Sequence, residues 1–576
     1  MPGWRQSWVL PAVAAALLLV GSVVAGVLLS AGGPSTASTA TVAAGAAVAS
    51  TAGGASAATG ASTAAGASAA AGGGARSSSG SRARGGDSAA GVVSSRPLSD
   101  PPLTVTVGDT SVGNPIPSGF LGFSFEFQAV RTYTGSDPRH INPVLVQLIR
   151  NLTPGQAPVL RIGGDSTDVS YVPAAGVGPP AYVSYPLTPS WMATTAALAK
   201  RLGAKLIMGL NLGADEPRLA AAEARGFVKA LGPSLEALEI GNEPNVYGKV
   251  TVAHSFFGVP VPARPKNFGY PAFHRQFNAI AAAAPRLTLA GPALAIGPTP
   301  SNGSWVGSMS RFLAGERRVS MMTVHRYPLR NCYVPPSSPQ YPSISHLLST
   351  YASAGLANSL KRWVAIAHGQ HRLLRVDELN SAACRGKTGV SNAFASALWV
   401  TDALFSLARA GVDGIDMHTL PNAAYELFQF SDTGGRWRAQ VRPVYYGLQL
   451  FAQAAPAGAQ LLSVGDQGRN TDFSTWATRA PDGTVRVVLI NKDQRRNRSV
   501  TLHLPAAVTA TATVERMRAP SVSSTGGVTL GGRSYGAETA SGELAAPRLA
   551  HVAATDGTIK LPVPHGSAAL VTIPAG

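Results

Sequence analysis

Two glutamates in this chain follow apolar runs that are typical of buried strands. Glu243 lies in LEIGNEPNVYG (238–248), inside an Asn-Glu-Pro sequence, and Glu378 lies in LLRVDELN (373–380). Two carboxylates that face each other across one cavity can hydrolyse a glycosidic bond, because one protonates the leaving oxygen while the other acts from the opposite side of the sugar. We therefore take Glu243 and Glu378 as the candidate catalytic pair.

Polar side chains end seven apolar runs between residues 120 and 420. They are Glu126, Asp165, Asn211, Glu243, His325, Glu378 and His418. In a parallel barrel the carboxyl ends of the strands form one rim, where the connecting loops carry the chemistry. We therefore expect these seven side chains to gather at one rim.

Eight short runs rich in apolar and β-branched residues alternate with helix-like segments after about residue 97. The runs are 120–127, 159–166, 205–212, 235–244, 286–294, 319–328, 373–380 and 412–420. Helical segments such as PLTPSWMATTAALAKRLG and VSNAFASALWVTDALFSLARAG lie between them. Eight such units over roughly 300 residues predict an α/β fold, a (β/α)8 TIM barrel over residues 119–430.

The pattern changes after residue 430 to short strands separated by Gly, Pro and Asp turns, such as TVRVVLINKD and SAALVTIP. This pattern predicts a C-terminal antiparallel β-sandwich domain over residues 431–576. The run LTVTVGD (103–109) precedes the barrel. We expect residues 97–118 to add a strand to the sandwich, so the second domain is discontinuous.

The first 96 residues have a different composition. Arg5 precedes an apolar run from Trp8 to Ala31, which is long enough to span a bilayer. We interpret residues 1–31 as a signal peptide or a membrane anchor, and both predict export, to the extracellular space or to the outer face of the cell membrane. Residues 32–96 are rich in Ala, Gly, Ser and Thr. Such a segment buries too little surface to fold, so we expect a disordered linker.

Composition excludes some classes of function. The chain has 576 residues, of which 45% are hydrophobic and 13% charged, and a net charge of +18. The length requires more than one domain, and the positive charge permits attraction to an acidic polymer, a wall or a membrane surface. The sequence has no zinc-type Cys/His cluster, P-loop or basic-aromatic patch, so we expect no metal, no cofactor and no nucleic-acid partner.

Taken together, the motifs resemble a known family. EIGNEPN with a downstream RVDELNS is similar to the retaining glycoside hydrolases of clan A. FLGFSFEF, LRIGGDSTD and the trailing sandwich resemble glycoside hydrolase family 79, the β-glucuronidase and heparanase group, over about residues 100–576. The resemblance implies double displacement on β-glucuronides or related polysaccharides, with Glu243 as the acid/base and Glu378 as the nucleophile.

The same resemblance implies roles for four further residues. Asn242 would bond the 2-hydroxyl of the sugar, and Tyr327 would hold the carboxylate of the nucleophile. Glu126 and Asp165 match positions that contact sugar hydroxyls. A nucleophile needs donors to stay ionised, whereas an acid needs a poorer environment to keep its proton, so these roles agree with the chemistry of the pair.

Other polar residues near the pair have less defined roles. His325 and His418 are candidates for shaping the pocket or filling it. Glu239 lies four residues before Glu243, so on a regular strand it points to the same side, one layer deeper. We expect Glu239 to be a buried structural carboxylate.

One stretch departs from the family pattern. Members that bind glucuronic acid usually have a tyrosine shortly after the nucleophile, where this chain has Ala383 and Cys384. Arg385 or Lys387 could supply a cation for the sugar carboxylate instead, and Tyr425 a hydroxyl. The alternatives to a glucuronide are another clan A specificity, for xylosides or glucosides, and a wall carbohydrate-binding protein that keeps the barrel without the chemistry.

The chain has two cysteines. Cys332 follows the sixth candidate strand and Cys384 follows the seventh. Neighbouring strands of a barrel bring both loops to one rim, and an exported chain with two such cysteines is expected to join them. We therefore hypothesise a disulfide beside Glu378.

Overall fold

The computed structural model describes residues 102–249, 251–254, 260–299, 305–465, 472–504 and 511–575. The predicted signal peptide or anchor and the predicted linker lie outside these residues. Among the helices of the described part, none is long and apolar enough to cross a bilayer.

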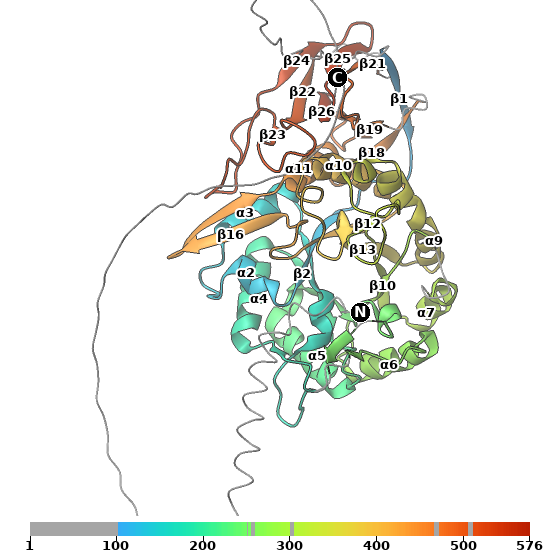
Figure 1. Ribbon diagram of the computed structural model, residues 1–576, viewed down its shortest axis with the longest axis vertical. Coiled ribbons are helices and arrows are strands. Elements are labelled where there is room, and N and C mark those ends of the chain that lie inside the picture. The colour runs from blue at the N-terminus through green and yellow to red at the C-terminus, as the bar shows by residue number, and fades with distance from the viewer. Residues whose placement is uncertain are drawn as a thin grey trace, which may run out of the picture. The chain divides into compact units, whose positions relative to one another are not determined.

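Eight parallel strands close into a barrel at the centre of the described chain (Figure 1). They are β2 (Leu121–Glu126), β3 (Val159–Gly163), β6 (Lys205–Leu210), β7 (Leu235–Ile240), β10 (Leu289–Ala295), β11 (Val319–His325), β13 (Leu373–Leu379) and β15 (Gly414–Thr419). β15 pairs with β2 and β7 pairs with β10, which closes the ring. The predicted TIM barrel is confirmed. Seven of the eight runs contain a whole strand, and the run 286–294 stops one residue before the end of β10.

Helices cover the outside of the barrel. They are α2 (Ala129–Thr134), α3 (Pro143–Leu152), α4 (Pro189–Leu202), α5 (Pro217–Leu231), α6 (Tyr270–Ala283), α7 (Met309–Gly315), α8 (Ile344–Leu348), α9 (Leu356–Gly369), α10 (Ala395–Arg409) and α11 (Pro443–Ala454). α4 shows how the sequence sets their ends. The Thr188 side chain accepts a hydrogen bond from the Trp191 N–H at its start, and Gly203, with φ of 65°, ends it in the left-handed conformation that glycine adopts at no steric cost.

Strand alternation sends apolar side chains outward and polar ones into the barrel. In β2, Phe123 and Phe125 are buried in the core that includes the outer helices. Inside the barrel, Arg375 forms two hydrogen bonds to Asp416, of 2.7 and 2.6 Å. A Cβ at Gly122 would collide with the Asp416 carboxylate. The barrel interior therefore holds paired charges beside a small apolar cluster of Val159, Ile207, Ala237, Ala290 and Met321, and a glycine provides the room for the charges.

A ten-stranded sheet forms the second layer of the chain. Its strands are β1 (Leu103–Ser111), β18 (Gln460–Val464), β19 (Phe473–Arg479), β20 (Val485–Asn491), β21 (Arg498–His503), β22 (Thr511–Arg518), β23 (Thr529–Leu530), β24 (Ala550–Ala553), β25 (Thr558–Val563) and β26 (Ser567–Ile573). β1 lies between β18 and β21, as the sequence predicts. The expectation of a purely antiparallel sheet is wrong at one pair, because β1 and β21 run parallel. No hairpin joins these two strands, so nothing forces them to be antiparallel.

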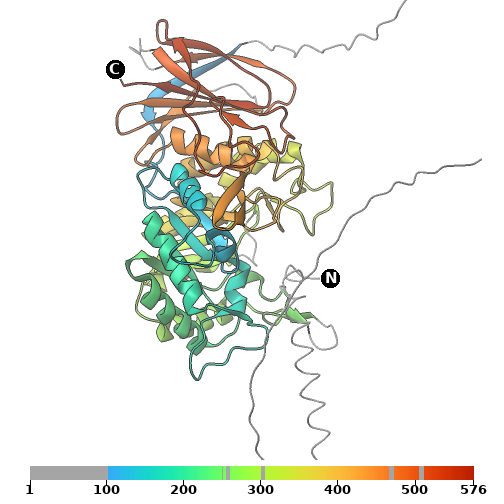
Figure 2. The same ribbon diagram turned by 90° about the vertical axis from the view of Figure 1, so that its left-hand side faces the viewer.

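Both faces of this sheet are buried over its middle strands. In β20, Val487 and Leu489 point into the core of the sandwich, whereas Val488 and Ile490 belong to the core shared with the barrel helices. Figure 2 shows the sheet lying against α10 and α11. The continuous apolar run in this strand follows from burial on two sides.

Smaller elements lie in the loops. Three two-stranded sheets pair β4 (Ser170–Tyr171) with β5 (Tyr185–Pro186), β8 (Thr251–His254) with β9 (Pro260–Pro262), and β12 (Leu329–Arg330) with β14 (Ala382–Ala383). A fourth, the hairpin of β16 (Phe428–Thr433) and β17 (Arg436–Val441), precedes α11. The predicted boundary at residues 430 and 431 falls inside this hairpin, and the strands of the large sheet resume at β18.

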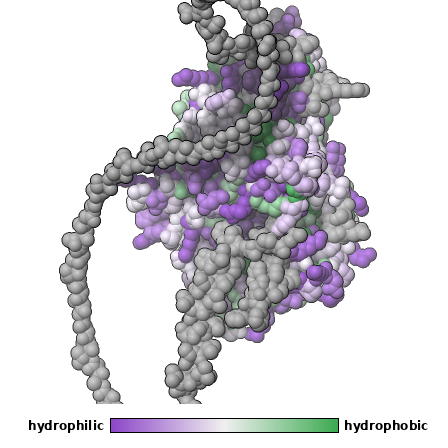
Figure 3. Space-filling model, in the orientation of Figure 1, coloured by the Kyte–Doolittle hydropathy of each residue, from purple (hydrophilic) through white to green (hydrophobic). Residues whose placement is uncertain are grey.

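The surface of the described chain is largely polar. Figure 3 shows hydrophilic side chains over much of one face, with apolar ones in small patches between them. The exposed large hydrophobic residues of the described part are Val228, Tyr333, Leu373 and Leu549. They come from four separate segments, which is ordinary for a folded protein.

Candidate active site

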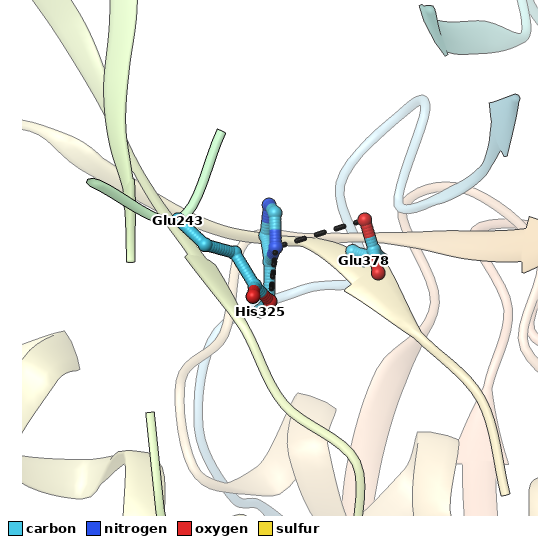
Figure 4. A group of neighbouring side chains, drawn as sticks. All are labelled: Glu243, His325 and Glu378. Atoms are coloured by element: carbon cyan, nitrogen blue, oxygen red, sulfur yellow. Dashed lines mark hydrogen bonds and ion pairs between the residues drawn. The ribbon is translucent and has the colours of Figure 1, made fainter. Parts of the chain in front are cut away.

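The side chains of Glu243 and Glu378 meet at the carboxyl end of the barrel. Figure 4 shows the two carboxylates on either side of the His325 ring, with each in contact with it. One oxygen of each glutamate and one ring nitrogen of His325 all lie within 4.8 Å of one another. Retaining glycosidases place their two carboxyl groups about 5–5.5 Å apart and inverting ones about 6.5–9.5 Å apart. The pair therefore lies in the range of direct attack.

Glu243 is held by its backbone, beyond the end of its strand. The sequence predicts a strand over 235–244, but β7 ends at Ile240, and Glu243 has φ of 52° just before the 3₁₀ helix Pro244–Val246. Its N–H donates to the carbonyl of Ala293 at 2.9 Å. Few non-glycine residues adopt this left-handed conformation, so its presence at the candidate acid marks a position that the surrounding structure imposes.

Glu378 is aimed by an irregularity in β13. From Arg375 to Glu378 this strand advances three residues while the paired β11 advances two, and β15 on its other side shows the same mismatch. One extra residue in a strand is a β-bulge, which re-aims side chains. As a result, the consecutive residues Asp377 and Glu378 both reach groups of the barrel interior.

A fully buried arginine, Arg161 of β3, connects the site. Its Nε donates to Glu239 Oε2 at 2.8 Å, and its Nη1 donates to Glu378 Oε2 at 3.1 Å. Its Nη2 donates to Asn242 Oδ1 at 2.9 Å. The sequence analysis did not select Arg161, although its charge stands alone in the apolar run VLRIG. Glu239 is buried and paired here, which agrees with the structural role predicted for it.

The second donor to Glu378 is Tyr327. Its hydroxyl donates to Glu378 Oε1 at 2.8 Å, the contact that the sequence predicted. Because Arg161 reaches the other oxygen, both oxygens of Glu378 accept hydrogen bonds. Burial raises the pKa of the Glu378 carboxyl above its ordinary value, and the positive charge of Arg161 opposes this shift. The two donors therefore favour the ionised form that a nucleophile needs.

His325 has a defined proton position. Its Nε2 lies 3.3 Å from Arg161 Nη2, and a guanidinium can only donate, so Nε2 accepts. Burial lowers the pKa of His325 to about 4, so the ring is neutral at pH 7. The single ring proton is therefore on Nδ1, which donates to Glu243 Oε1 at 3.1 Å. His325 thus orients the candidate acid/base.

The same three residues also form a group close enough to hold a metal ion. Their lone pairs, however, have other partners. Glu378 accepts from Arg161 and Tyr327, and the His325 nitrogen that faces both carboxylates carries the proton. The donor set fits proton transfer better than it fits metal coordination.

Asn242 and Asp165 form a second polar contact beside the pair. The Asn242 Nδ2 donates to Asp165 Oδ1 at 3.3 Å, while its Oδ1 faces Arg161. Glu126 has protein partners as well. It accepts from the Ser166 N–H at 2.7 Å and from the Asp165 N–H at 3.1 Å. The predicted contacts of these residues with sugar hydroxyls remain predictions, and the structure adds that Glu126 anchors the loop after β3.

Asn211 does not join the site, although it ends one of the seven runs. Its Nδ2 donates to the carbonyl of Ser170, and its Oδ1 accepts from the Ala214 N–H. Asn211 directly follows β6, so its place at the rim agrees with the prediction, and it was not among the predicted site residues. Its amide is used to hold two loops, which is the alternative fate of a polar residue after a strand.

The wall behind Glu378 consists of rings and basic residues. The Tyr425 ring lies 6.1 Å from the Tyr327 ring and 5.8 Å from the His418 ring. Arg385 donates from Nη2 to the carbonyl of Pro421 at 2.9 Å, and its charge acts on Tyr425. Arg385 thus lies beside the residues that line the site.

Lys387 is engaged outside this wall. Its Nζ donates to the Tyr341 hydroxyl at 2.8 Å and lies 4.1 Å from the centre of that ring. Of the two cations that the sequence analysis considered for a sugar carboxylate, Arg385 is therefore the one placed next to Tyr425.

The predicted disulfide is present. Cys332 and Cys384 are joined, with their Cα atoms 6.1 Å apart. The bond lies next to the parallel pairing of β12 and β14, so the loops that follow β11 and β13 run together beside Glu378. The cross-link and this small sheet fix the segment that begins at the nucleophile.

A separate hollow of about 700 Å³ lies at the opposite end of the barrel. Its lining comes from the end of α6 and from the residues before β10 and β11, and includes Arg286, Glu316 and Arg317. None of the carboxylates described above lines it. The amino end of such a barrel contributes to stability rather than chemistry.

A TIM barrel whose rim holds two opposed glutamates, with donors on one and a histidine between them, defines a glycoside hydrolase. Residues 475–570 match the C-terminal beta domain of glycosyl hydrolase family 79. This match, the relatives and the shared fold reported below support glycoside hydrolase family 79 as the family of this chain.

Named relatives agree with this assignment. The chain is 26% identical to a β-glucuronidase of Aspergillus niger over 509 residues, which cover 80% of this chain and 91% of that protein. It is 23% identical to a β-glucuronidase of Neurospora crassa over 383 residues, 61% of this chain and 66% of the relative.

Solved structures share the fold. A 4-O-α-L-rhamnosyl-β-D-glucuronidase from Fusarium oxysporum superposes with a TM-score of 0.64 at 21% identity, covering 82% of this chain and all of that one. A family 51 arabinofuranosidase from Xanthomonas axonopodis pv. citri gives a TM-score of 0.57 at 14% identity, over 82% of this chain and 99% of the other.

Proposed function

We propose that this protein is a retaining β-glycosidase that acts on β-glucuronides or related glycans by double displacement. The observation that carries the proposal is the approach of Glu243 and Glu378, whose oxygens lie within 4.8 Å on either side of His325. A separation this small leaves no room for an attacking water between the second carboxylate and the sugar, so the carboxylate itself attacks.

In the first step Glu243 gives its proton to the glycosidic oxygen as the bond from that oxygen to the anomeric carbon breaks. A Glu378 oxygen forms a bond to the same carbon, giving a covalent glycosyl-enzyme. In the second step Glu243 removes a proton from water, the water oxygen attacks the anomeric carbon, and the bond to Glu378 breaks. Two inversions return the β configuration.

The neighbouring groups support these roles. Arg161 and Tyr327 donate to Glu378 and stabilise its charge when it is released in the second step. His325 Nδ1 donates to one oxygen of Glu243, which leaves the other oxygen for the proton in transit. Asn242, next to Glu243, is the residue that we assign to the 2-hydroxyl of the sugar.

Glucuronide specificity is supported by the named relatives in fungi and by one basic residue. The site has four carboxylates, on Glu126, Asp165, Glu243 and Glu378, so a sugar that carries its own carboxylate needs a cation on one side. Arg385 lies beside Tyr425, on the wall behind Glu378. We assign these two residues to the sugar carboxylate.

We also propose that the protein is exported and acts on carbohydrate outside the cell, released or held at the membrane by its N-terminal segment. The apolar run from Trp8 to Ala31 supports this location. The disulfide supports it as well, because such bonds persist in oxidising compartments.

The test is hydrolysis of a panel of aryl β-glycosides by the wild type and by the Glu243→Gln and Glu378→Gln variants. We expect turnover of the β-glucuronide, a product that is first released as the β anomer by NMR, and a loss of about 10³-fold or more in both variants. Preference for a xyloside or a glucoside would replace the proposed glucuronide specificity with another clan A specificity. Binding without turnover of any glycoside would favour a carbohydrate-binding protein. Turnover unaffected by Glu378→Gln would refute the assigned nucleophile.

The assignment of Arg385 gives a specificity prediction. Arg385→Gln should lower kcat/KM for an aryl β-glucuronide by about 10-fold or more while leaving the matching glucoside nearly unchanged, because it removes a charge that only the uronate uses. Lys387→Gln is the matched control, since Lys387 bonds Tyr341. Equal losses on both substrates would show that Arg385 supports the loop rather than the sugar.

A further inference from the structure

The residue before the nucleophile, Asp377, is a buried carboxyl that the mechanism above does not use. Its side chain is fully buried, and among the described residues neither of its oxygens has a hydrogen-bond donor at bonding distance. The nearest cationic nitrogen, Arg161 Nε, is 3.7 Å away, and His325 Nε2 is also at 3.7 Å. An ionised carboxylate without donors is costly in such a place, because nothing replaces its hydration.

The β-bulge in β13 brings Asp377 against a second buried carboxyl, that of Glu239 on β7. Both carboxyls contact the same nitrogen, Arg161 Nε, at 2.8 Å from Glu239 and 3.7 Å from Asp377, so they lie side by side, and each shifts the pKa of the other as a hydrogen-bond partner. Two carboxylates repel each other, so such a contact is a bond only if one of them carries a proton. Glu239 already accepts from Arg161 at 2.8 Å and from the Thr323 hydroxyl at 2.7 Å, which favours its ionised form.

The surrounding charges lead to the same distribution. Arg161 is a single guanidinium that contacts three carboxyls, those of Glu239, Asp377 and Glu378. The other charged groups that face Asp377 are Arg375 on its own strand and Asp416 on β15, which neutralise each other. His325 on β11 is neutral, as argued above. Three ionised carboxylates would leave this buried cluster with two uncompensated charges.

We propose that Asp377 remains protonated at the pH where the enzyme works and donates its proton to Glu239, so that the charge of Arg161 is shared by Glu239 and Glu378 alone. Asp377 is then a positioning residue. It touches no substrate, and it acts on the nucleophile through Glu239 and Arg161.

The electrostatics of the pair agree with this placement of the proton. Burial, followed by the negative charge of Glu239, raises the pKa of Asp377 well above its ordinary value. Burial alone would raise the pKa of Glu239 too, but the charge of Arg161 and the hydrogen bonds from Asp377 and Thr323 together lower that pKa. Below its raised pKa, Asp377 therefore holds the proton while Glu239 stays ionised.

The first arm of the test is infrared spectroscopy of the wild-type protein labelled with carboxyl-¹³C aspartate. An un-ionised, buried aspartic acid has a carbonyl stretch that is distinct from that of aspartate and shifts in D₂O. We expect this band at neutral pH and its loss in Asp377→Asn. Its absence from the wild type, or its persistence in the variant, would overturn the proposal. This arm needs no substrate, so it stands even if the proposed function fails.

The second arm is kinetic and rests on the proposed function. Asp377→Asn keeps the shape, the neutrality and a donor towards Glu239, so kcat and the acidic limb of the pH profile of kcat/KM should stay within about 3-fold of the wild type. Glu239→Gln removes a charge that Arg161 shares, so kcat should fall by about 10-fold or more and the acidic limb should move. A large loss in Asp377→Asn with a shifted acidic limb would show that Asp377 is ionised in the native enzyme.

Discussion

The two oxygens of Glu378 have donors of different kinds. Arg161 approaches Oε2 from the barrel interior with a full positive charge, and Tyr327 approaches Oε1 from the rim with a neutral hydroxyl. The positive charge of the guanidinium stabilises the carboxylate in any orientation of the carboxylate. The neutral tyrosine hydroxyl stabilises it only when the hydrogen bond is well aligned. Removal of the Tyr327 hydroxyl should therefore affect the orientation of the Glu378 carboxylate for attack on the sugar more than the folding of the barrel.

This leads to a prediction for Tyr327→Phe. The variant keeps the ring packing with Tyr425 and loses one hydrogen bond to the nucleophile, so kcat should fall about 10- to 100-fold with little change in KM. Steady-state kinetics on the best aryl glycoside measure it. Tyr425→Phe is the comparison, because in the described structure its hydroxyl makes no hydrogen bond to Glu378, so loss of that hydroxyl should raise KM for the glucuronide rather than lower kcat. Equal losses of kcat in both variants would contradict the specific role of Tyr327.

At the scale of residues, the sequence predicted those site residues that lie in a contiguous motif. Glu243 and Asn242 were found in Asn-Glu-Pro, and Glu378 in the stretch RVDELN. Arg161 and Asp377 were not predicted as site residues. Their roles depend on partners on other strands, and a single charged residue in an apolar run does not show which partners it contacts. A polar residue after a strand predicts a place near the rim but not its partner, so the sequence does not show that the Asn211 amide holds two loops instead of facing the site.

At the scale of elements, the runs of apolar residues located all eight barrel strands but not their irregularities. A period of two in the sequence cannot show the extra residue in β13, since a bulge is defined only against the neighbouring strands. The same holds for β10, whose register against β11 shifts between Gly291 and Leu294. That shift lies next to Ala293, whose carbonyl accepts from the Glu243 N–H. The two irregular strands thus position the two candidate catalytic glutamates.

Removing the disulfide would measure how much this covalent link between the rim loops contributes to the stability of the protein. Cys332 and Cys384 are 52 residues apart in the chain, so their bond restricts a long loop of the unfolded state. The Cys332→Ser/Cys384→Ser double variant should lose about 2–4 kcal/mol of stability and melt several degrees lower. Thermal denaturation with and without reductant measures this. The wild type should approach the variant when reduced, and an unchanged melting temperature in the variant would contradict a stabilising role.

At the scale of the whole described chain, the sheet and the barrel share one interface. Trp476 of β19 donates from Nε1 to Asp402 Oδ1 at 2.9 Å, and Asp402 belongs to α10 of the barrel. Lys492, just after β20, donates to the other oxygen at 2.8 Å. Sequence reasoning anticipated a discontinuous sandwich from one early strand. It did not anticipate this pair, because the two partners are 90 residues apart and each is ordinary in its own segment.

The buried pair predicts a large cost for removing one partner. Lys492→Met leaves the Asp402 carboxylate buried without its cation, which should destabilise the protein by about 3–5 kcal/mol. The Asp402→Asn/Lys492→Met double variant should lose less than Lys492→Met alone, since it leaves no uncompensated charge. Denaturant unfolding of the wild type, both single variants and the double variant measures the coupling as a cycle. Strictly additive losses of unfolding free energy would contradict a coupling between Asp402 and Lys492.

The charge of this pair also predicts how the difference in stability between the wild type and Lys492→Met depends on pH. Burial alone would raise the pKa of Asp402, but Lys492, helped by the hydrogen bonds from Trp476 and Ser353, lowers the pKa below its ordinary value of 3.8. A carboxyl whose pKa is lower in the folded state than in the unfolded state stabilises the fold above the unfolded value, and the contribution is lost as the pH falls through the folded one. The gap in stability between the wild type and Lys492→Met should therefore be largest at pH 7 and should shrink as the pH falls. Burial raises the pKa of Asp402 once Lys492 is gone, so the variant loses its bare buried charge above the ordinary pKa of 3.8, and the wild-type contribution is lost below that value. Thermal melts from pH 7 to pH 3 would reveal this, and a gap that stays constant would mean that packing of the lysine stem, rather than its charge, joins the sheet to the barrel.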